Sequence, residues 1–250
     1  MTKFFPAMAF ALLAATSLST AALARPPISP ERLSQDVKIL ASEEFQGRAP
    51  GTEGETITLN WLVKQLETIG LEPAGPGGQW TQDVPLVRTQ VQPGAMQASL
   101  NGKVIPLAQG KEVFVSTVRP VDRVTIDNAP MVFVGYGVTA PEQGWDDFKG
   151  VDLKGKIAVF LVNDPDFEAT EADDAAGKFG NRRMTYYGRW TYKFEEAARR
   201  GAIGALIVHD TPGAGYDWKT VIAPGGENYD LADVPADQRI LLQGWLEGAA

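Results

Sequence analysis

Apolar residues recur at helical spacing in three segments of the chain. The first helix is predicted to have Ser29 as its N-cap and Pro30 as its first residue. The third helix is predicted within the segment YYGRWTYKFEEAARRG, with Gly201 as its end. The apolar face of the first helix is expected to comprise Leu33, Val37, Leu40 and Ala41. That of the third is expected to comprise Trp190, Phe194, Ala197 and Ala198.

The second helix follows a glycine-rich loop, residues 42–55, with the sequence SEEFQGRAPGTEGE. Thr52 and Glu55 have the spacing of a capping box, in which each side chain accepts a hydrogen bond from the other residue's backbone. Gly70 is placed to end this helix. Its buried stripe is expected to comprise Leu59, Leu62, Val63, Leu66 and Ile69.

Elsewhere the pattern is typical of strands. The segment QASLNGKVIPL predicts a hairpin around the Asn-Gly pair at positions 101–102. Further strands are expected at residues 84–87 and 157–162, and in EVFVSTV, RVTID, APMVFVGYGV and AIGALIVHD. The segment RILLQGWLEGAA is expected to be a strand followed by the start of a helix. Because the third helix separates two apolar strands, those strands are expected to be parallel.

Composition and charge exclude several classes of function. The chain has 250 residues, a net charge of −8 and a pI near 4.8, which argues against a nucleic-acid partner. The absence of cysteine excludes a disulfide scaffold, a cysteine nucleophile and thiolate metal sites. His209 is the single histidine, so the sequence contains no histidine-rich zinc site.

The beginning of the chain is typical of a secretory signal peptide. Lys3 is followed by an apolar run, and AALA offers a cleavage site after Ala24. We therefore expect residues 1–24 to be removed and the protein to be secreted or periplasmic, with no stable membrane insertion after cleavage. An uncleaved anchor is the alternative.

The remaining motifs do not define a catalytic centre. The glycine-rich loop lacks the G-x-x-x-x-G-K pattern of a phosphate loop, and GYG at residues 135–137 lacks a third glycine. The segment DPDFEA departs from a calcium loop at Ala169 and Ala175, so a solvated acidic loop is expected. His209 is expected to be structural, because no G-x-S-x-G motif is present. A serine hydrolase that uses His209 remains a third alternative.

The aromatic-rich segment around the third helix offers candidate ligand contacts. The aromatic residues around the third helix are expected to be mainly packing. Tyr187 and Arg189 precede that helix and are the candidates for exposed, substrate-binding side chains.

Two segments together resemble a known family. LASEEFQGRAPGTEGETITLNWLVKQLETIGLEP, followed by a tryptophan and VPLV, resembles the N-terminal opening of the co-catalytic zinc aminopeptidases. That family includes the glutamate carboxypeptidases and the transferrin receptor ectodomain. The segment DLKGKIAVFLV with TYKFEEAARRGAIGALIVHD is similar to the protease-associated domain that many of these enzymes carry.

The resemblance implies an α/β fold in two parts. Residues 25–89 would be the first helices and edge strand of an α/β zinc exopeptidase domain. Residues 90–237 would be an inserted, mostly-β (α+β) protease-associated domain, and residues 238–250 would return to the peptidase domain. The implied function is a secreted aminopeptidase with a peptide substrate and two zinc ions.

The family's zinc ligands and catalytic Glu follow the inserted domain, so the resemblance transfers no ligand or catalytic residue to this chain. The 250 residues are therefore expected to be an inactive N-terminal fragment of the enzyme. Arg48 is the candidate functional side chain of the glycine-rich loop and a candidate substrate-binding residue. It is expected to brace the loop by pairing with a carboxylate or backbone carbonyls near the peptidase site. The alternative is a non-catalytic, exported module that binds peptides or another protein. Oligomeric state is not indicated.

Overall fold

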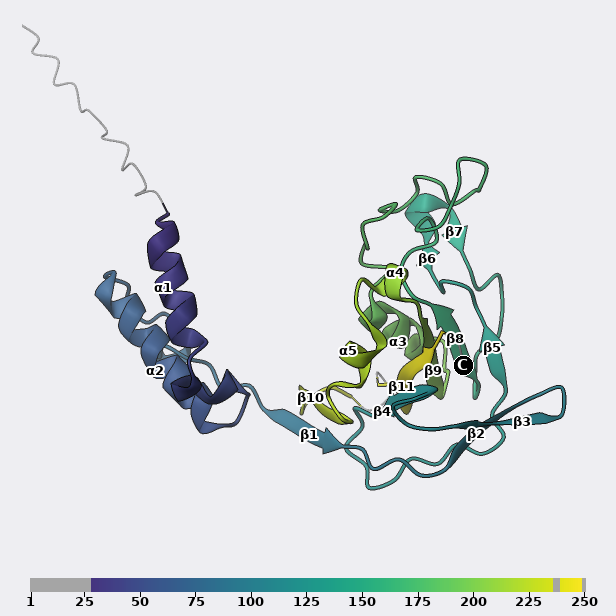
Figure 1. The fold of residues 1–250 in the computed structure, drawn as a ribbon, viewed down its shortest axis with the longest axis horizontal. Coiled ribbons are helices and arrows are strands. Elements are labelled where there is room, and N and C mark those ends of the chain that lie inside the picture. The colour runs from purple at the N-terminus through teal and green to yellow at the C-terminus, as the bar shows by residue number, and fades with distance from the viewer. Residues whose placement is uncertain (1–27, 236–238, 249–250) are drawn as a thin grey trace, which may run out of the picture. The chain divides into compact units, whose positions relative to one another are not determined.

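The computed structural model describes residues 28–235 and 239–248, in two compact units that comprise residues 1–82 and 83–250 (Figure 1). The expected signal peptide and its cleavage point after Ala24 lie outside the described residues. Helices combine with a mixed sheet, so the described chain has an α/β fold. No helix in the described part of the chain is long and apolar enough to cross a membrane.

The first unit contains two α-helices and two short 3-10 helices: α1 (Pro30–Leu40), η1 (Glu43–Arg48), α2 (Glu53–Thr68) and η2 (Pro76–Gly78). The predicted start of α1 is confirmed. The Ser29 hydroxyl accepts a hydrogen bond from the backbone N–H of Arg32, and Pro30 is the first helical residue.

The predicted end of α2 is also confirmed. Gly70 has a φ of 82°, in the left-handed region that glycine adopts without strain. Its N–H bonds to the carbonyl of Glu67, and the next N–H, that of Leu71, bonds to the carbonyl of Leu66. This pair of bonds is a Schellman motif, which satisfies the last carbonyls of the helix.

The capping box at the start of α2 was predicted wrongly. Thr52 is the N-cap residue, but its hydroxyl donates to the carbonyl of Ala49 (2.7 Å) instead of accepting from the helix. The Glu55 carboxylate accepts from the N–H of Gly51 (2.7 Å), one residue before the predicted donor. The two side chains therefore tie the helix to the preceding loop.

The apolar stripes of the first unit are not buried as predicted. Among its described residues only Phe45 and Gly54 are buried, and Leu33 on α1 remains 58% exposed. A helix stripe is buried only where another element covers it. Within this unit, α1 and α2 do not enclose a core.

The second unit is built on a five-stranded sheet in the order β4-β11-β9-β8-β5. Its strands are β4 (Val113–Ser116), β11 (Leu242–Glu247), β9 (Gly204–His209), β8 (Ile157–Leu161) and β5 (Met131–Phe133). All neighbours are parallel except β4 and β11. Helix α3 (Trp190–Arg199) joins β8 to β9, so the predicted parallel crossover is confirmed.

Three two-stranded sheets complete this unit. They pair β1 (Leu86–Gln90) with β10 (Glu227–Leu231), β2 (Met96–Leu100) with β3 (Lys103–Leu107), and β6 (Thr139–Ala140) with β7 (Trp145–Asp146). The short helices are η3 (Pro141–Gln143), α4 (Thr211–Ala214) and α5 (Trp218–Ile222). The predicted hairpin is confirmed, with positive φ at Asn101 and Gly102 as a type I′ turn requires.

The five-stranded sheet buries both of its faces. On one face α3 packs against the strands, and the completely buried residues there include Ala158, Phe160 and Ile207. On the other face a smaller cluster forms around Val115 and Leu206. Met96 and Leu107 of the β2–β3 hairpin pack against this second cluster.

Some expected boundaries do not coincide with the structure. The segment RVTID, residues 123–127, forms no strand, and the strand expected at residues 84–87 begins at Leu86. The two compact units divide at residues 82–83, and the domain boundary that the resemblance implies, at residues 89–90, falls within β1. The domain assignment itself stays a prediction. The described residues 239–248 include β11 and belong to the second unit, because β11 pairs on both sides within its sheet. The helix expected after β11 lies outside the described residues.

Candidate functional site

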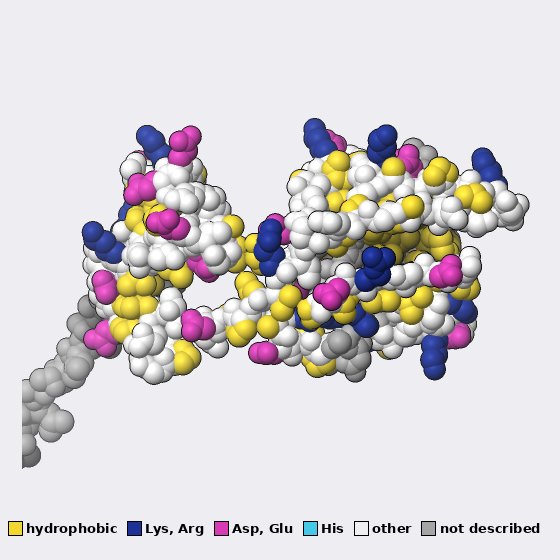
Figure 2. All heavy atoms as spheres, turned by 90° about the horizontal axis from the view of Figure 1, so that it is seen from below, with side chains coloured by type: hydrophobic (Ala, Val, Ile, Leu, Met, Phe, Trp, Pro, Cys, Tyr) yellow, Lys and Arg dark blue, Asp and Glu magenta, His cyan; other side chains and the backbone are white. Residues whose placement is uncertain are grey.

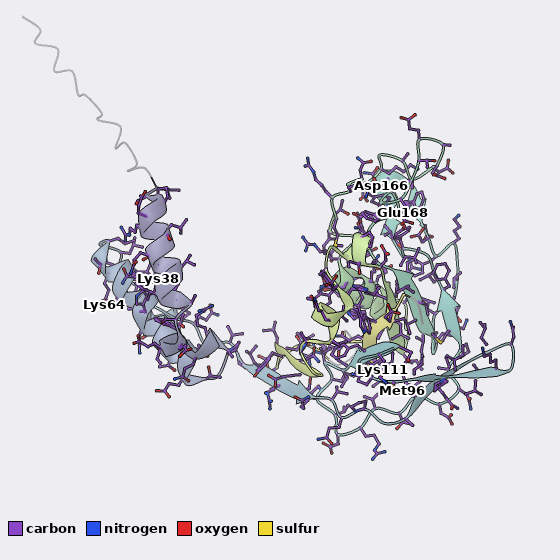
Figure 3. The ribbon with its side chains drawn as sticks, in the orientation of Figure 1. Lys38, Lys64, Met96, Lys111, Asp166 and Glu168 are labelled. Atoms are coloured by element: carbon purple, nitrogen blue, oxygen red, sulfur yellow. The ribbon has the colours of Figure 1, made fainter. Side chains whose placement is uncertain are left out.

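A large cavity in the second unit has a volume of about 1000 Å³. Its walls are two extended segments, residues 87–96 and 120–126, and residues 115–117 and Leu242 line it as well. Figure 2 shows a hollow on the face of this unit seen from below, with hydrophobic side chains in it. Met96 from β2, labelled in Figure 3, also lines the cavity.

A smaller cavity, of about 300 Å³, is lined by residues from the face of the sheet that α3 covers. Five aromatic side chains line it: Phe114, Trp190, Phe194, Tyr216 and Trp245. The buried side-chain nitrogen of Asn228 has no hydrogen-bond partner among the described residues. This cavity suits a small apolar group, and the larger one suits a longer ligand.

Lys193 of α3 occupies a buried polar site. It is 0% exposed, and its ammonium group donates to the carbonyls of Tyr136 (2.6 Å) and Asn163 (3.0 Å). Burial lowers the pKa of Lys193 to about 7, against the attraction of Asp164 and Asp147. Burial in turn raises the pKa of both carboxyl groups. The amine therefore joins α3 to two loops through backbone carbonyls.

The acidic loop after β8 is not fully solvated, contrary to prediction. Asp164 is 0% and Asp166 3% exposed. Asp164 accepts from the backbone and hydroxyl of Thr185 (2.6 and 2.8 Å), and Asp166 accepts from the N–H groups of Phe179 and Asn181. These two carboxylates replace missing backbone partners in a long connection. Figure 3 shows Asp166 and Glu168 within it.

Zinc does not fit the described residues. Residues 28–235 and 239–248 contain no group of three or more His, Cys, Asp or Glu side chains placed to hold a metal ion. The two zinc ions that the resemblance implies therefore have no ligand set in this part of the chain.

Arg48, the candidate of the glycine-rich loop, braces that loop. Its guanidinium donates to the carbonyl of Leu40 at the end of α1, as one form of the prediction had it. Its φ of 59° is unusual for a residue with a side chain. It forms no ion pair within the described chain, so its contact with substrate stays a prediction.

Tyr187 and Arg189 lie two positions apart in the segment that precedes α3. The Tyr187 hydroxyl donates to Glu142 (2.5 Å), and this bond raises the pKa of Tyr187 to about 12. Its ring packs edge-on against Tyr192 and Phe179, as the packing interpretation of the aromatic residues expects. Arg189 is exposed and its side chain has no partner in the described chain. Arg189 is thus the freer of the two for ligand binding.

His209 has a structural environment. It is 3% exposed, its Nε2 lies 3.0 Å from the carbonyl oxygen of Tyr216, and its ring is surrounded by those of Tyr216, Trp218 and Trp245. No serine hydroxyl bonds to it among the described residues. The geometry gives no support to a Ser-His-Asp triad.

The structure thus places Tyr187 and Arg189 in the segment before α3, in the second unit, and Arg48 in the first unit. The residues that line the large cavity were not among the candidates. Their signal in the sequence was the alternating segment RVTID, which was interpreted as an ordinary strand.

Comparison with known proteins gives similarities to solved structures alone, and four solved chains match. No protein family and no characterised protein sequence matches the chain. Among solved structures, the aminopeptidase from Aneurinibacillus sp. strain AM-1 is similar, with a TM-score of 0.35 and 18% sequence identity. The similarity covers 88% of this chain and 38% of that chain. A TM-score this low establishes no shared fold.

Proposed function

We propose that this chain supplies the substrate-facing, non-hydrolytic part of a secreted, zinc-dependent aminopeptidase. The observation that carries the proposal is the way in which the residues of the family-like pattern interlock. Phe45 is the buried side chain of the first unit and packs edge-on against Trp61. A Cβ atom at Gly54 would lie 2.5 Å from the carbonyl oxygen of Phe45, so only glycine fits there.

Arg48 completes this arrangement through the carbonyl of Leu40. Phe45, Gly54 and Arg48 therefore stabilise one local structure. This shared structure gives the sequence resemblance a physical basis. The exposed apolar side chains Leu33, Val37 and Ile69 also support the proposal, because such a face is typical of an element that another part of a protein covers.

Hydrolysis belongs, in this proposal, to a metal-binding part outside the described residues. We expect the reading frame to continue past Ala250 into a segment with His, Asp and Glu ligands. Zinc held there would polarise the scissile carbonyl and supply hydroxide. The described residues would bind and orient the peptide.

The test is hydrolysis of an aminoacyl p-nitroanilide, measured with zinc for two proteins. The 250-residue chain is expected to release no nitroaniline above the blank, and the product of the complete reading frame is expected to release it. Chelator-sensitive hydrolysis by the 250-residue chain would contradict the proposal that the metal-binding part lies elsewhere. If the product of the complete reading frame released no nitroaniline, the proposed aminopeptidase activity would be wrong.

The second candidate is an exported, non-catalytic module that binds peptides. The cavity of about 1000 Å³ in a unit with its own core favours it. A reading frame that stops at Ala250, together with measurable peptide affinity, would decide for this candidate.

A further inference from the structure

Residues 122–127, one wall of the large cavity, have an unusual backbone. They have the side-chain alternation of a strand, because Val124 and Ile126 are half-buried whereas Arg123, Thr125 and Asp127 are exposed. Residues 122–126 line the cavity. Yet the backbone of this segment forms no hydrogen bond with any described residue. Exposed backbone groups without a protein partner bond to water, and an added strand can take the place of that water. This segment therefore has the side-chain alternation of a strand together with free backbone groups.

The opposite wall also has a free backbone edge. Strand β1 pairs only with β10, and the bonds from Val91 to Gly226 and from Ala232 to Pro85 fix which groups face β10. Because peptide groups alternate in direction along an antiparallel strand, those of Arg88 and Gln90 point away from β10. The cavity thus lies between two backbone edges.

The remaining lining combines apolar side chains with uncharged polar ones such as Thr89, Ser116 and Thr117, and its charges are balanced. Val115 and Leu242 of the central sheet line the cavity, together with Met96. Of the charged side chains, Arg88 is paired with Glu227 (2.6 Å), and Asp122 and Arg123 carry opposite charges. This balance favours an uncharged ligand over an anion.

We propose that this cavity binds an extended, uncharged peptide by strand addition along residues 122–127, with alternate side chains against Val115 and Leu242. Main-chain bonds to a free edge provide affinity, and the apolar lining selects every second side chain. The inference rests on the proposed function, because it takes the bound peptide to be a substrate segment. The inference names the cavity as the peptide-binding site and strand addition as the mode of recognition.

The probe is an acetylated and amidated hexapeptide of alternating threonine and valine, titrated calorimetrically into the 250-residue chain. Two N-methylated copies are compared with it, one methylated at the valines and one at the threonines. Because the proposal pairs the peptide with residues 122–127 alone, one copy is expected to bind at least about 10-fold more weakly. The other copy is expected to stay within about 3-fold of the parent. No binding of the parent peptide, or equal affinity of all three, would overturn the proposal.

Amide hydrogen exchange gives a second readout. The parent peptide is expected to slow exchange in residues 122–127, because their N–H groups acquire acceptors. Peptide binding without this protection would overturn strand addition.

A matched pair of variants locates the site. Val124→Asp places a charge in the cavity and is expected to weaken peptide binding at least about 10-fold. Val104→Asp makes the same change at a 55% exposed valine of β3, outside the cavity, and is expected to leave binding unchanged. Equal effects of both variants would contradict this site. Failure of the proposed function would appear as absent hydrolysis with peptide binding intact, whereas failure of this inference would appear as absent binding whatever the hydrolysis.

Discussion

The ammonium group of Lys193 is solvated by two backbone carbonyls instead of water, and this arrangement has a consequence for stability. The pKa of Lys193 is lowered from 10.5 to about 7 in the folded chain by burial. Between these values the unfolded chain binds more protons than the folded chain. The free energy of unfolding therefore rises with pH across this range, by at most about 1.4 kcal/mol per pH unit from this group.

We predict that Lys193→Met removes this rise. Urea unfolding at pH 7, 8 and 9 (about one unit apart, to sample the titration) is expected to show increasing stability for the unmodified chain and a flatter profile for the variant. Lys111→Met, at an exposed lysine, is the control and is expected to keep the rise. Parallel profiles for the unmodified chain and Lys193→Met would show that this amine is not the titrating group.

The junction of η1 with α2 depends on one close approach between elements. Alanine in place of glycine normally stabilises a helix by about 1 kcal/mol. At position 54 the added Cβ would lie 2.5 Å from the carbonyl oxygen of Phe45, a backbone atom that does not move freely. We predict that Gly54→Ala reverses the usual sign and destabilises the first unit by about 1–3 kcal/mol, the range for overpacking.

Hydrogen exchange of the α2 amides measures this effect. The control is Thr56→Ala, at an exposed position of the same helix, where the better helix propensity of alanine is expected to slow exchange slightly. Slower exchange in Gly54→Ala than in the unmodified chain would show that the contact with Phe45 does not constrain the helix.

Elements whose cause is local could be predicted from the sequence. Ser29 and Gly70 begin and end their helices through bonds to near neighbours, and the Asn-Gly turn defines its own hairpin. RVTID has the alternation of a strand but no neighbour to pair with, and sequence alternation does not report whether a neighbour exists. The stripe of α2 failed for the same reason, because burial depends on a covering element.

The candidate site was predictable only in part. Arg48 was expected to pair with a carboxylate or backbone carbonyls, and its guanidinium donates to the carbonyl of Leu40. Lys193 gave no signal, because a lysine on an amphipathic helix is normally exposed. The large cavity combines segments distant in sequence, and only the folded chain brings residues 87–96 and 120–126 together.

At the scale of the whole molecule, the two units have separate sources of stability. The first depends on Phe45, and the second on completely buried residues such as Ile207 in its central sheet. We predict that Ile207→Ala destabilises the second unit by about 2–5 kcal/mol. Hydrogen exchange is expected to quicken in β8 and β9 and to stay unchanged in α2.

Phe45→Ala is the reciprocal variant, expected to quicken exchange in α2 and to leave β8 and β9 unchanged. Because changes at independent sites add, the exchange of each unit in the double variant should equal that of the corresponding single variant. If Ile207→Ala also quickened exchange in α2, the units would unfold together. The stability of the first unit would then depend on the core of the second, in addition to its own packing around Phe45.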